Sequence, residues 1–168
     1  LPPLCEKIFC DGGYASILPN FEHRPEQAQM AYCCAQAYAG NSALLFEAGT
    51  GVGKSMAYLV SGIIAARRLK RQLGGATHTI ALQQQILEKD LPRIRMMFSN
   101  CDALSDCADF KATILFGRAN YLCSHRLKRA LAVKRELFDT TESAELERIS
   151  RWAMKTRTGL VEELNPPP

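Results

Sequence analysis

The sequence predicts an α/β fold in which a parallel sheet is flanked by helices. Short apolar runs alternate with helical segments along the chain, which is the order that builds parallel sheets. A glycine-rich loop, residues 49–53, stands directly between one apolar run and one helical segment. These two observations favour a strand–loop–helix unit in the first half of the chain.

Three short runs are predicted strands, at residues 43–46, 76–79 and 112–116. The first has the length and apolar character of a buried strand in a sheet that is covered on both faces. Gly74 and Gly75 precede the second run and would weaken a strand interior. Either that strand is therefore very short, or the sequence lacks residues there.

Helix signals stand before, between and after these runs. Pro25 opens a helix that continues to about Ala39 and stops at Gly40 and Asn41. A second helix begins at Lys54 and ends in the basic stretch 67–71, where cations suit the helix dipole. Further helices are expected at about 82–89, interrupted by Pro92, and around 121–138 and 143–155. Residues 1–23 show no period and are expected to be an irregular lead-in.

Composition restricts the class of protein. The 168 residues, 47% apolar and 23% charged, suit one ordinary domain, and no apolar run approaches the ~20 residues of a membrane span. The first residues lack the pattern of a secretory signal, so we expect a cytoplasmic protein without membrane contact. The seven cysteines include no Cys-x-x-Cys pair, which argues against a disulfide framework. The net charge of +4 permits nucleic-acid binding without arguing for it.

The glycine-rich loop carries the residues that phosphate binding requires. Its glycines allow successive backbone N–H groups to surround a phosphate at the start of a helix. Lys54 would supply the charge for the β- and γ-phosphates of ATP, and the Ser55 hydroxyl would bind Mg²⁺. Ala48 stands where the strict P-loop pattern has glycine. The predicted ATP-binding residues of the loop are Ala48, Gly49, Thr50, Gly51, Val52, Gly53, Lys54 and Ser55, with Lys54 and Ser55 as the catalytic pair.

Four blocks, at residues 24–30, 47–55, 77–85 and 117–123, together resemble the DinG family of DinG/XPD-like superfamily 2 DNA helicases. The resemblance implies a RecA-like P-loop fold, incomplete in this chain, and ATP-driven 5′ to 3′ translocation on single-stranded DNA. It divides the chain into the lead-in 1–23, a first part of motor domain 1 at 24–116, and a helical segment at 117–168 that resembles the truncated start of the iron–sulfur insertion.

The resemblance also assigns residues. Arg24 and Gln27 correspond to the Q motif, which holds adenine, with Gln29 as a second candidate; a glutamine amide can pair with adenine's donor and acceptor. The alternative is an exposed glutamine at a helix start. Residues 77–79 correspond to motif Ia, which lies along the DNA backbone. Its predicted DNA-binding residues are Thr77, His78, Thr79 and Gln83. The alternatives are a strand end with a local cap and a polar helix face.

Cys123 matches the first of four iron–sulfur ligands in the family, but no cysteine follows it. Four thiolates are the usual complement, so this chain does not build such a cluster in that way, and a plain buried thiol is the alternative. Relatives associated with CRISPR systems lack a working cluster, which leaves a CRISPR ribonucleoprotein open as a partner. The basic run contains the predicted DNA contacts Arg118, Arg126, Lys128 and Arg129, followed by Lys134 and Arg135. A solvated helix face is the alternative interpretation of this run.

Two other classes of function use the same loop. A P-loop kinase of a small molecule would also need Lys54 and Ser55, and a non-catalytic binding module could retain the loop inside a CRISPR assembly. No Asp-Glu-x-His sequence occurs in the chain. We therefore expect the isolated chain to show little ATP turnover, although its loop is intact.

Overall fold

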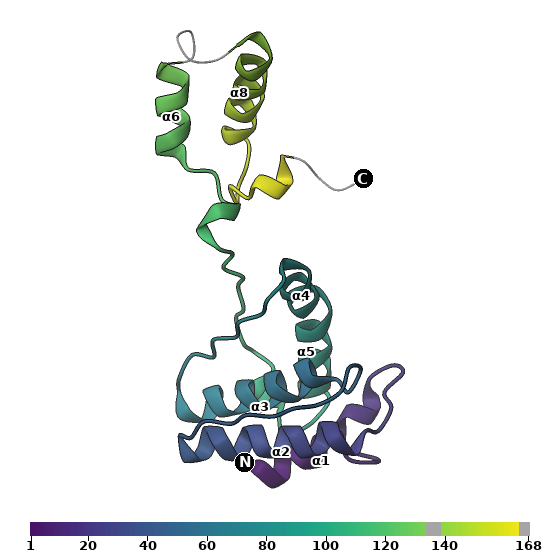
Figure 1. The fold of residues 1–168 in the computed structure, drawn as a ribbon. Coiled ribbons are helices and arrows are strands. Elements are labelled where there is room, and N and C mark those ends of the chain that lie inside the picture. Colours follow the sequence, from purple (N-terminus) through teal and green to yellow (C-terminus); the bar gives the residue numbers. More distant parts are fainter. Residues whose placement is uncertain (134–138, 165–168) are drawn as a thin grey trace. The chain divides into compact units, whose positions relative to one another are not determined.

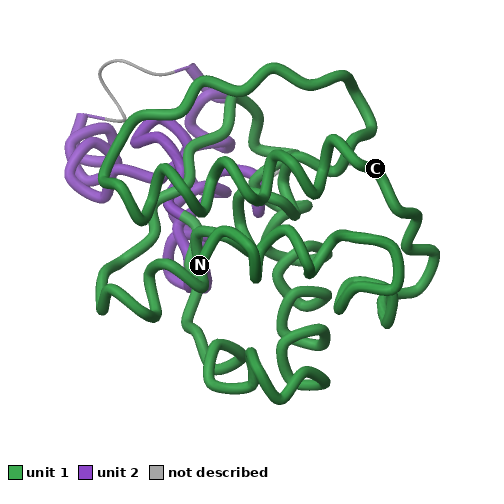
Figure 2. The backbone as a smooth tube through the Cα atoms, turned by 90° about the horizontal axis from the view of Figure 1, so that it is seen from below, with its two compact units in different colours: residues 1–114 green, residues 115–168 purple. Residues whose placement is uncertain are grey.

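A computed structural model describes residues 1–133 and 139–164. The chain divides into two compact units, unit 1 (Leu1–Ile114) and unit 2 (Leu115–Pro168), which Figure 2 colours separately. Across the described ranges the regular structure is helical, and the β-pairing is one isolated antiparallel bridge between Tyr121 and Leu160. The predicted α/β fold with a parallel sheet, RecA-like or otherwise, is therefore wrong for this structure.

Unit 1 contains five α-helices and three shorter helical segments (Figure 1). The α-helices are α1 (Pro2–Phe9), α2 (Pro25–Gly40), α3 (Lys54–Leu69), α4 (Ile80–Gln85) and α5 (Leu91–Ser99). The shorter segments are η1 (Tyr14–Ile17), the π-helix η2 (Ile86–Asp90) and η3 (Ser105–Cys107). The described elements of unit 2 are η4 (Arg118–Asn120), α6 (Ser124–Ala132), α8 (Thr140–Ala153) and η5 (Val161–Glu163). None of the helices in the described ranges is long and apolar enough to span a bilayer.

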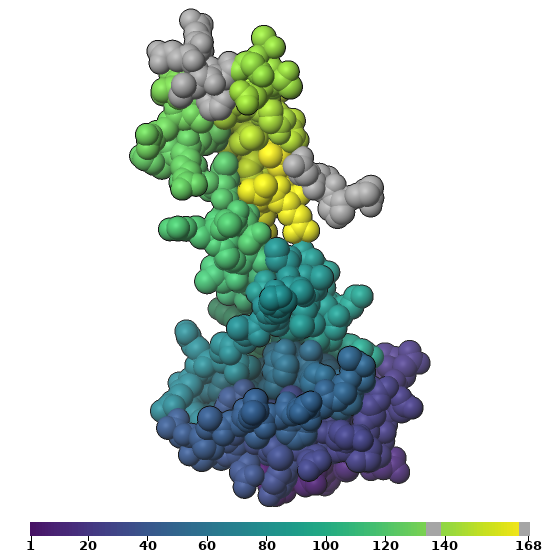
Figure 3. Space-filling view, viewed as in Figure 1, coloured from purple at the N-terminus to yellow at the C-terminus, as the bar shows by residue number. Residues whose placement is uncertain are grey.

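The core of unit 1 forms where α2 packs between α1 and α3 (Figure 1). Phe9 and Ile64 are almost fully buried there, and Phe98 joins them from α5. Burial of each such side chain contributes roughly 1.5–3 kcal/mol. The one buried hydroxyl, Ser61, donates a hydrogen bond of 2.9 Å to the Ala31 carbonyl, which ties α3 to α2. In the space-filling view, side chains fill the gaps that the ribbon leaves between these helices (Figure 3).

The three predicted strands have no regular structure, which is the reason that the fold prediction fails. Residues 43–46 form a connection between α2 and α3, with the Leu45 side chain 99% exposed, and Leu115 in the third run is 82% exposed. A strand needs a neighbouring strand to satisfy its backbone N–H and C=O groups. The apolar faces of α1, α2 and α3 form the core of unit 1 instead, and no ladder forms among the described residues.

The predicted helices from Pro25 and Lys54 are confirmed. Asn41 ends α2 in the left-handed conformation with φ 49°, which matches the predicted stop. The expectation of an irregular lead-in at 1–23 is wrong, because Pro2 and Pro3 start α1, which buries Cys5, Ile8 and Phe9 on one face. A short helix of this kind is stabilised by its packing, which the local sequence does not show.

Pro92 does not interrupt the third helix as predicted. The chain remains helical from α4 through η2 into α5, and Pro92 lies in the first turn of α5, where a missing N–H costs little. The π-helical turn η2 lies directly before α5. It accommodates the change in backbone hydrogen bonding that the missing N–H of Pro92 causes. Burial raises the pKa of the Asp90 carboxyl, whose Oδ2 atom has no hydrogen-bond partner.

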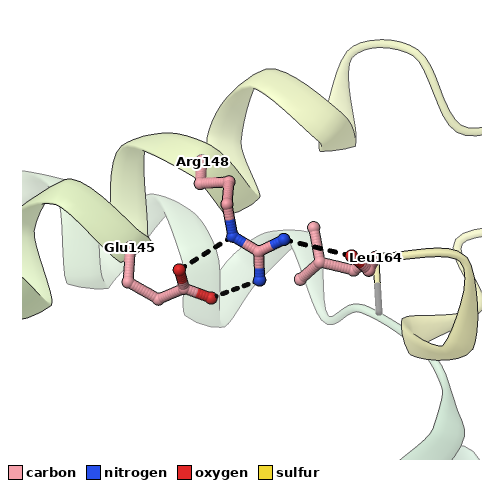
Figure 4. A network of polar contacts seen from close by, with 3 residues as sticks. All are labelled: Glu145, Arg148 and Leu164. Carbon is pink, nitrogen blue, oxygen red and sulfur yellow. Dashed lines mark hydrogen bonds and ion pairs between the residues drawn. The ribbon is translucent and has the colours of Figure 1, made fainter. Parts of the chain in front are cut away.

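Unit 2 is held by polar contacts around α8. Arg148 donates two hydrogen bonds to Glu145, of 2.8 and 2.6 Å, and a third of 3.0 Å to the Leu164 carbonyl (Figure 4). The helices α6 and α8 lie within the segments predicted at 121–138 and 143–155, apart from the first residues of α8, while 134–138 fall outside the described residues.

Candidate functional site

The glycine-rich loop leads directly into α3, which is the third of the five α-helices of unit 1. Gly51 and Gly53 both have φ of +82°, in the region that favours glycine. Gly53 is the N-cap residue of α3, and no side chain caps the helix. The N–H groups of the first turn and the positive end of the helix dipole are therefore available to an anion.

Lys54, the first residue of α3, folds its side chain back over the loop. Its Nζ atom donates to the Ala48 carbonyl at 2.9 Å and to the Gly49 carbonyl at 2.7 Å. No acidic side chain pairs with this ammonium within the described ranges. Two neutral carbonyls compensate a charge weakly, so a phosphate group is the better partner for it.

The start of α2 contacts the same loop. Arg24 donates a hydrogen bond of 2.5 Å to the Gly51 carbonyl and also pairs with Glu22 at 2.6 Å. The buried Gln27 side chain donates to the Gly53 carbonyl at 3.0 Å. The structure therefore brings two of the predicted adenine-binding residues onto the loop, whereas the Gln29 side chain is exposed on α2.

The remaining loop residues differ in exposure. Thr50 is exposed, and Val52 and Ser55 are half-buried. Ser55 is the second residue of α3, so its hydroxyl lies next to the uncapped helix end. The contact of Arg24 with Glu22 was not predicted, although the two residues stand two positions apart in the sequence.

The predicted motif Ia segment lies where α4 begins. Thr79 is the N-cap residue of α4, and its Oγ1 atom accepts a hydrogen bond of 3.3 Å from the Leu82 amide. Thr77 donates to the Thr79 carbonyl at 3.1 Å, and His78 is exposed. Gln83 is half-buried on α4. The structure thus shows a local cap, and a DNA contact for this segment stays a prediction.

The predicted basic DNA contacts lie in unit 2. Arg118 belongs to η4, and the exposed side chains of Arg126, Lys128 and Arg129 belong to α6. No buried residue occurs on α6, so these cations lie on a solvated helix. Lys134 and Arg135 lie outside the described residues.

The cysteines do not form a metal site. No group of three or more His, Cys, Asp or Glu side chains in the described part of the chain could hold a metal ion. The Cys123 thiol is exposed at the start of α6, so the alternative of a buried thiol is wrong at this position, and an iron–sulfur cluster does not fit the residues present. Burial and the neighbouring Asp106 raise the pKa of the Cys107 thiol to about 11. The predicted Mg²⁺ ligand, Ser55, lies at the start of α3 beside the loop, and a Mg²⁺ site there stays a prediction.

Comparisons with known proteins find relatives over most of the chain. It is 34% identical over 149 residues to the ATP-dependent DNA helicase YoaA of Haemophilus influenzae, which covers 89% of this chain and 21% of the relative. It is 35% identical over 155 residues to the ATP-dependent helicase DinG of Mycobacterium tuberculosis (85% of this chain, 23% of the relative). It is 31% identical over 153 residues to the 3′-5′ exonuclease DinG of Bacillus subtilis (91% and 15%).

The chain is therefore homologous to ATP-dependent DNA helicases. Within that class its relatives are the DinG and YoaA proteins, as the four sequence blocks predict. The chain spans about a fifth of the length of these relatives. No protein-family model matches the chain. No solved structure matches it.

Proposed function

We propose that the chain is the ATP-binding front part of a DNA helicase that translocates 5′ to 3′ on single-stranded DNA in the cytoplasm. The observation that carries the proposal is the convergence of Arg24, Gln27 and Lys54 on one glycine-rich loop, in a chain homologous to DinG helicases. These relatives favour the helicase over a small-molecule kinase. The names of these relatives do not mention CRISPR, so a CRISPR assembly is not part of the proposal.

Each residue has a role in this proposal. Lys54 exchanges its two carbonyl partners for the β- and γ-phosphates, which bear full negative charge. The N–H groups of the loop and of the first turn of α3 surround the phosphates. Arg24 and Gln27, with Gln29, contact the adenine. Ser55 would supply one oxygen to Mg²⁺, which when bound would stabilise the charge on the phosphates.

DNA binding is assigned to polar groups that contact the sugar-phosphate backbone. The hydroxyls of Thr77 and Thr79, with His78 and Gln83, would bind phosphate oxygens without reading bases. Arg118 and the three cations of α6 add sequence-independent affinity, because neutralised phosphates release counterions. The names of the relatives support a DNA substrate in general.

The test is ATP binding to the 168-residue chain by titration calorimetry with Mg²⁺. We expect Lys54→Ala to weaken binding at least about tenfold, because a charge-assisted contact is lost. Lys111→Ala, which removes an exposed cation of unit 1 elsewhere, should leave the affinity unchanged. Equal affinity of Lys54→Ala and the unsubstituted chain would refute the assignment of the loop. In a phosphate-release assay with single-stranded DNA we expect little turnover, as the chain contains no Asp-Glu-x-His sequence.

A further inference from the structure

A cluster of cations lies where α3 ends, and the proposed function does not use it. Four of the five residues from 67 to 71 are Arg or Lys, and all four side chains are exposed. We name Arg67, Arg68, Lys70 and Arg71 the α3 cationic cluster. Across 1–133 and 139–164, none of the four makes a side-chain hydrogen bond or an ion pair.

Favourable interaction with the helix dipole explains only part of this cluster. Arg67 and Arg68 lie in the last turn of α3, where cations are stabilised. Backbone amides already bond two carbonyls at this end, however, since the Arg71 amide donates to the Ala66 carbonyl at 2.9 Å and the Lys70 amide bonds the Ala66 and Arg67 carbonyls. Lys70 and Arg71 lie beyond Leu69, the last helical residue. In the described ranges, neither of their side chains bonds a carbonyl of the helix end.

The backbone at Lys70 strengthens this point. Lys70 has φ 53° and ψ 45°, the left-handed conformation that ends many helices and that glycine adopts most easily. A lysine there is strained relative to glycine, so the sequence keeps a cation at a position where the fold favours a residue without a side chain. Strain of this kind is typical of functional positions.

The surroundings leave the cluster strongly positive. The segment η3 packs against α3 and brings Asp106 near, and the charges of Arg67 and Arg68 act on the adjacent Cys107. The one carboxylate that η3 carries does not neutralise four cations. The cluster therefore attracts a ligand with several closely spaced negative charges.

We infer that the α3 cationic cluster binds the phosphate backbone of single-stranded DNA, as an extension of the contact at residues 77–79. This inference rests on the DNA-binding part of the proposed function. Arg71 precedes Thr77 by six residues without regular structure, so their Cα atoms lie at most about 21 Å apart. A few nucleotides of a single strand bridge that distance, and backbone contacts carry no sequence preference.

The experiment measures fluorescence anisotropy of a labelled oligothymidine against KCl concentration, with the 168-residue chain. The variant Arg67→Gln/Arg68→Gln/Lys70→Asn/Arg71→Gln uses asparagine at 70 because it tolerates the left-handed conformation. Its slope of log K against log [KCl] should be shallower by about 0.7 for each lost contact, up to about 2.8. Circular dichroism checks that it folds.

Three further variants make the result decisive. Arg67→Lys/Arg68→Lys/Arg71→Lys retains the charges and should retain the slope. Arg67→Gln/Arg68→Gln should flatten the slope more than Lys89→Gln/Lys111→Gln, which removes the same charge from exposed positions elsewhere in unit 1. If the slopes of log K against log [KCl] are equal for these last two variants, the α3 cationic cluster does not bind DNA, although DNA binding elsewhere on the chain still stands. Absence of binding by the unsubstituted chain would overturn both the cluster and the proposed DNA interface.

Discussion

Substitution of Gly53 by alanine should destabilise unit 1 through backbone strain and through one defined contact. A Cβ atom at this position would lie 2.2 Å from the Gln27 Nε2 atom, and φ is +82°. The left-handed conformation costs a residue with a side chain roughly 1–2 kcal/mol. Displacement of Gln27 also breaks its hydrogen bond to the Gly53 carbonyl, for about 0.5–1.5 kcal/mol. We therefore expect a loss of about 2–3 kcal/mol.

The assay is urea unfolding followed by far-ultraviolet circular dichroism. With an m-value of about 2 kcal/mol per M, the midpoint should fall by about 1 M. In a double-mutant cycle, the loss caused by Gly53→Ala should shrink to about 1–2 kcal/mol when Gln27 is already alanine, since the clash is gone. Equal losses with and without the Gln27 side chain would refute the argument.

Three other predictions concern unit 1 and the thiols. Because burial raises the pKa of Cys107 from the ordinary 9.0 to about 11, its thiol stabilises the fold below pH 9, and this contribution should disappear as the pH rises from about 9 to 11; urea midpoints across that range should depend less on pH in Cys107→Ala. At pH 8, iodoacetamide should label the exposed Cys123 before the buried cysteines, as peptide mass mapping would show, and earlier labelling of Cys107 would contradict its burial. Gly13→Ala should lower the thermal midpoint of unit 1 by several degrees, because its Cβ would lie 2.2 Å from the Lys7 carbonyl oxygen; an unchanged midpoint would contradict this close approach.

The sequence predicts those elements that depend on local signals. The start of α2 at Pro25 and its end at Asn41 follow from the proline's fixed φ and from the asparagine's tolerance of the left-handed conformation. The loop and the start of α3 at Lys54 were also predicted, and the structure confirms these boundaries. Such signals act within one helical turn, so they are readable without knowledge of the fold.

The strands could not be predicted in the same way. Residues 43–46 have the composition of a buried strand, but strand formation depends on a partner elsewhere in the chain, which composition does not reveal. The same limit applies to the site. The family resemblance predicts Arg24 and Gln27 as adenine-binding residues, which stays a prediction, whereas their hydrogen bonds to the Gly51 and Gly53 carbonyls require the packing of α2 against α3.

The π-helical turn at Ile86–Asp90 also determines how the chain tolerates changes in length. A π turn contains one residue more per hydrogen-bonded ring than an α turn, so deletion of one residue from this segment can be absorbed by conversion to regular α-helix. A deletion within α5 cannot be absorbed in this way, because α5 is already a regular α-helix. It would rotate part of the helix by about 100° and turn Met97 and Phe98 away from the core. Along the helical run from Ile80 to Ser99, a one-residue deletion is therefore tolerated in η2 but not in α5.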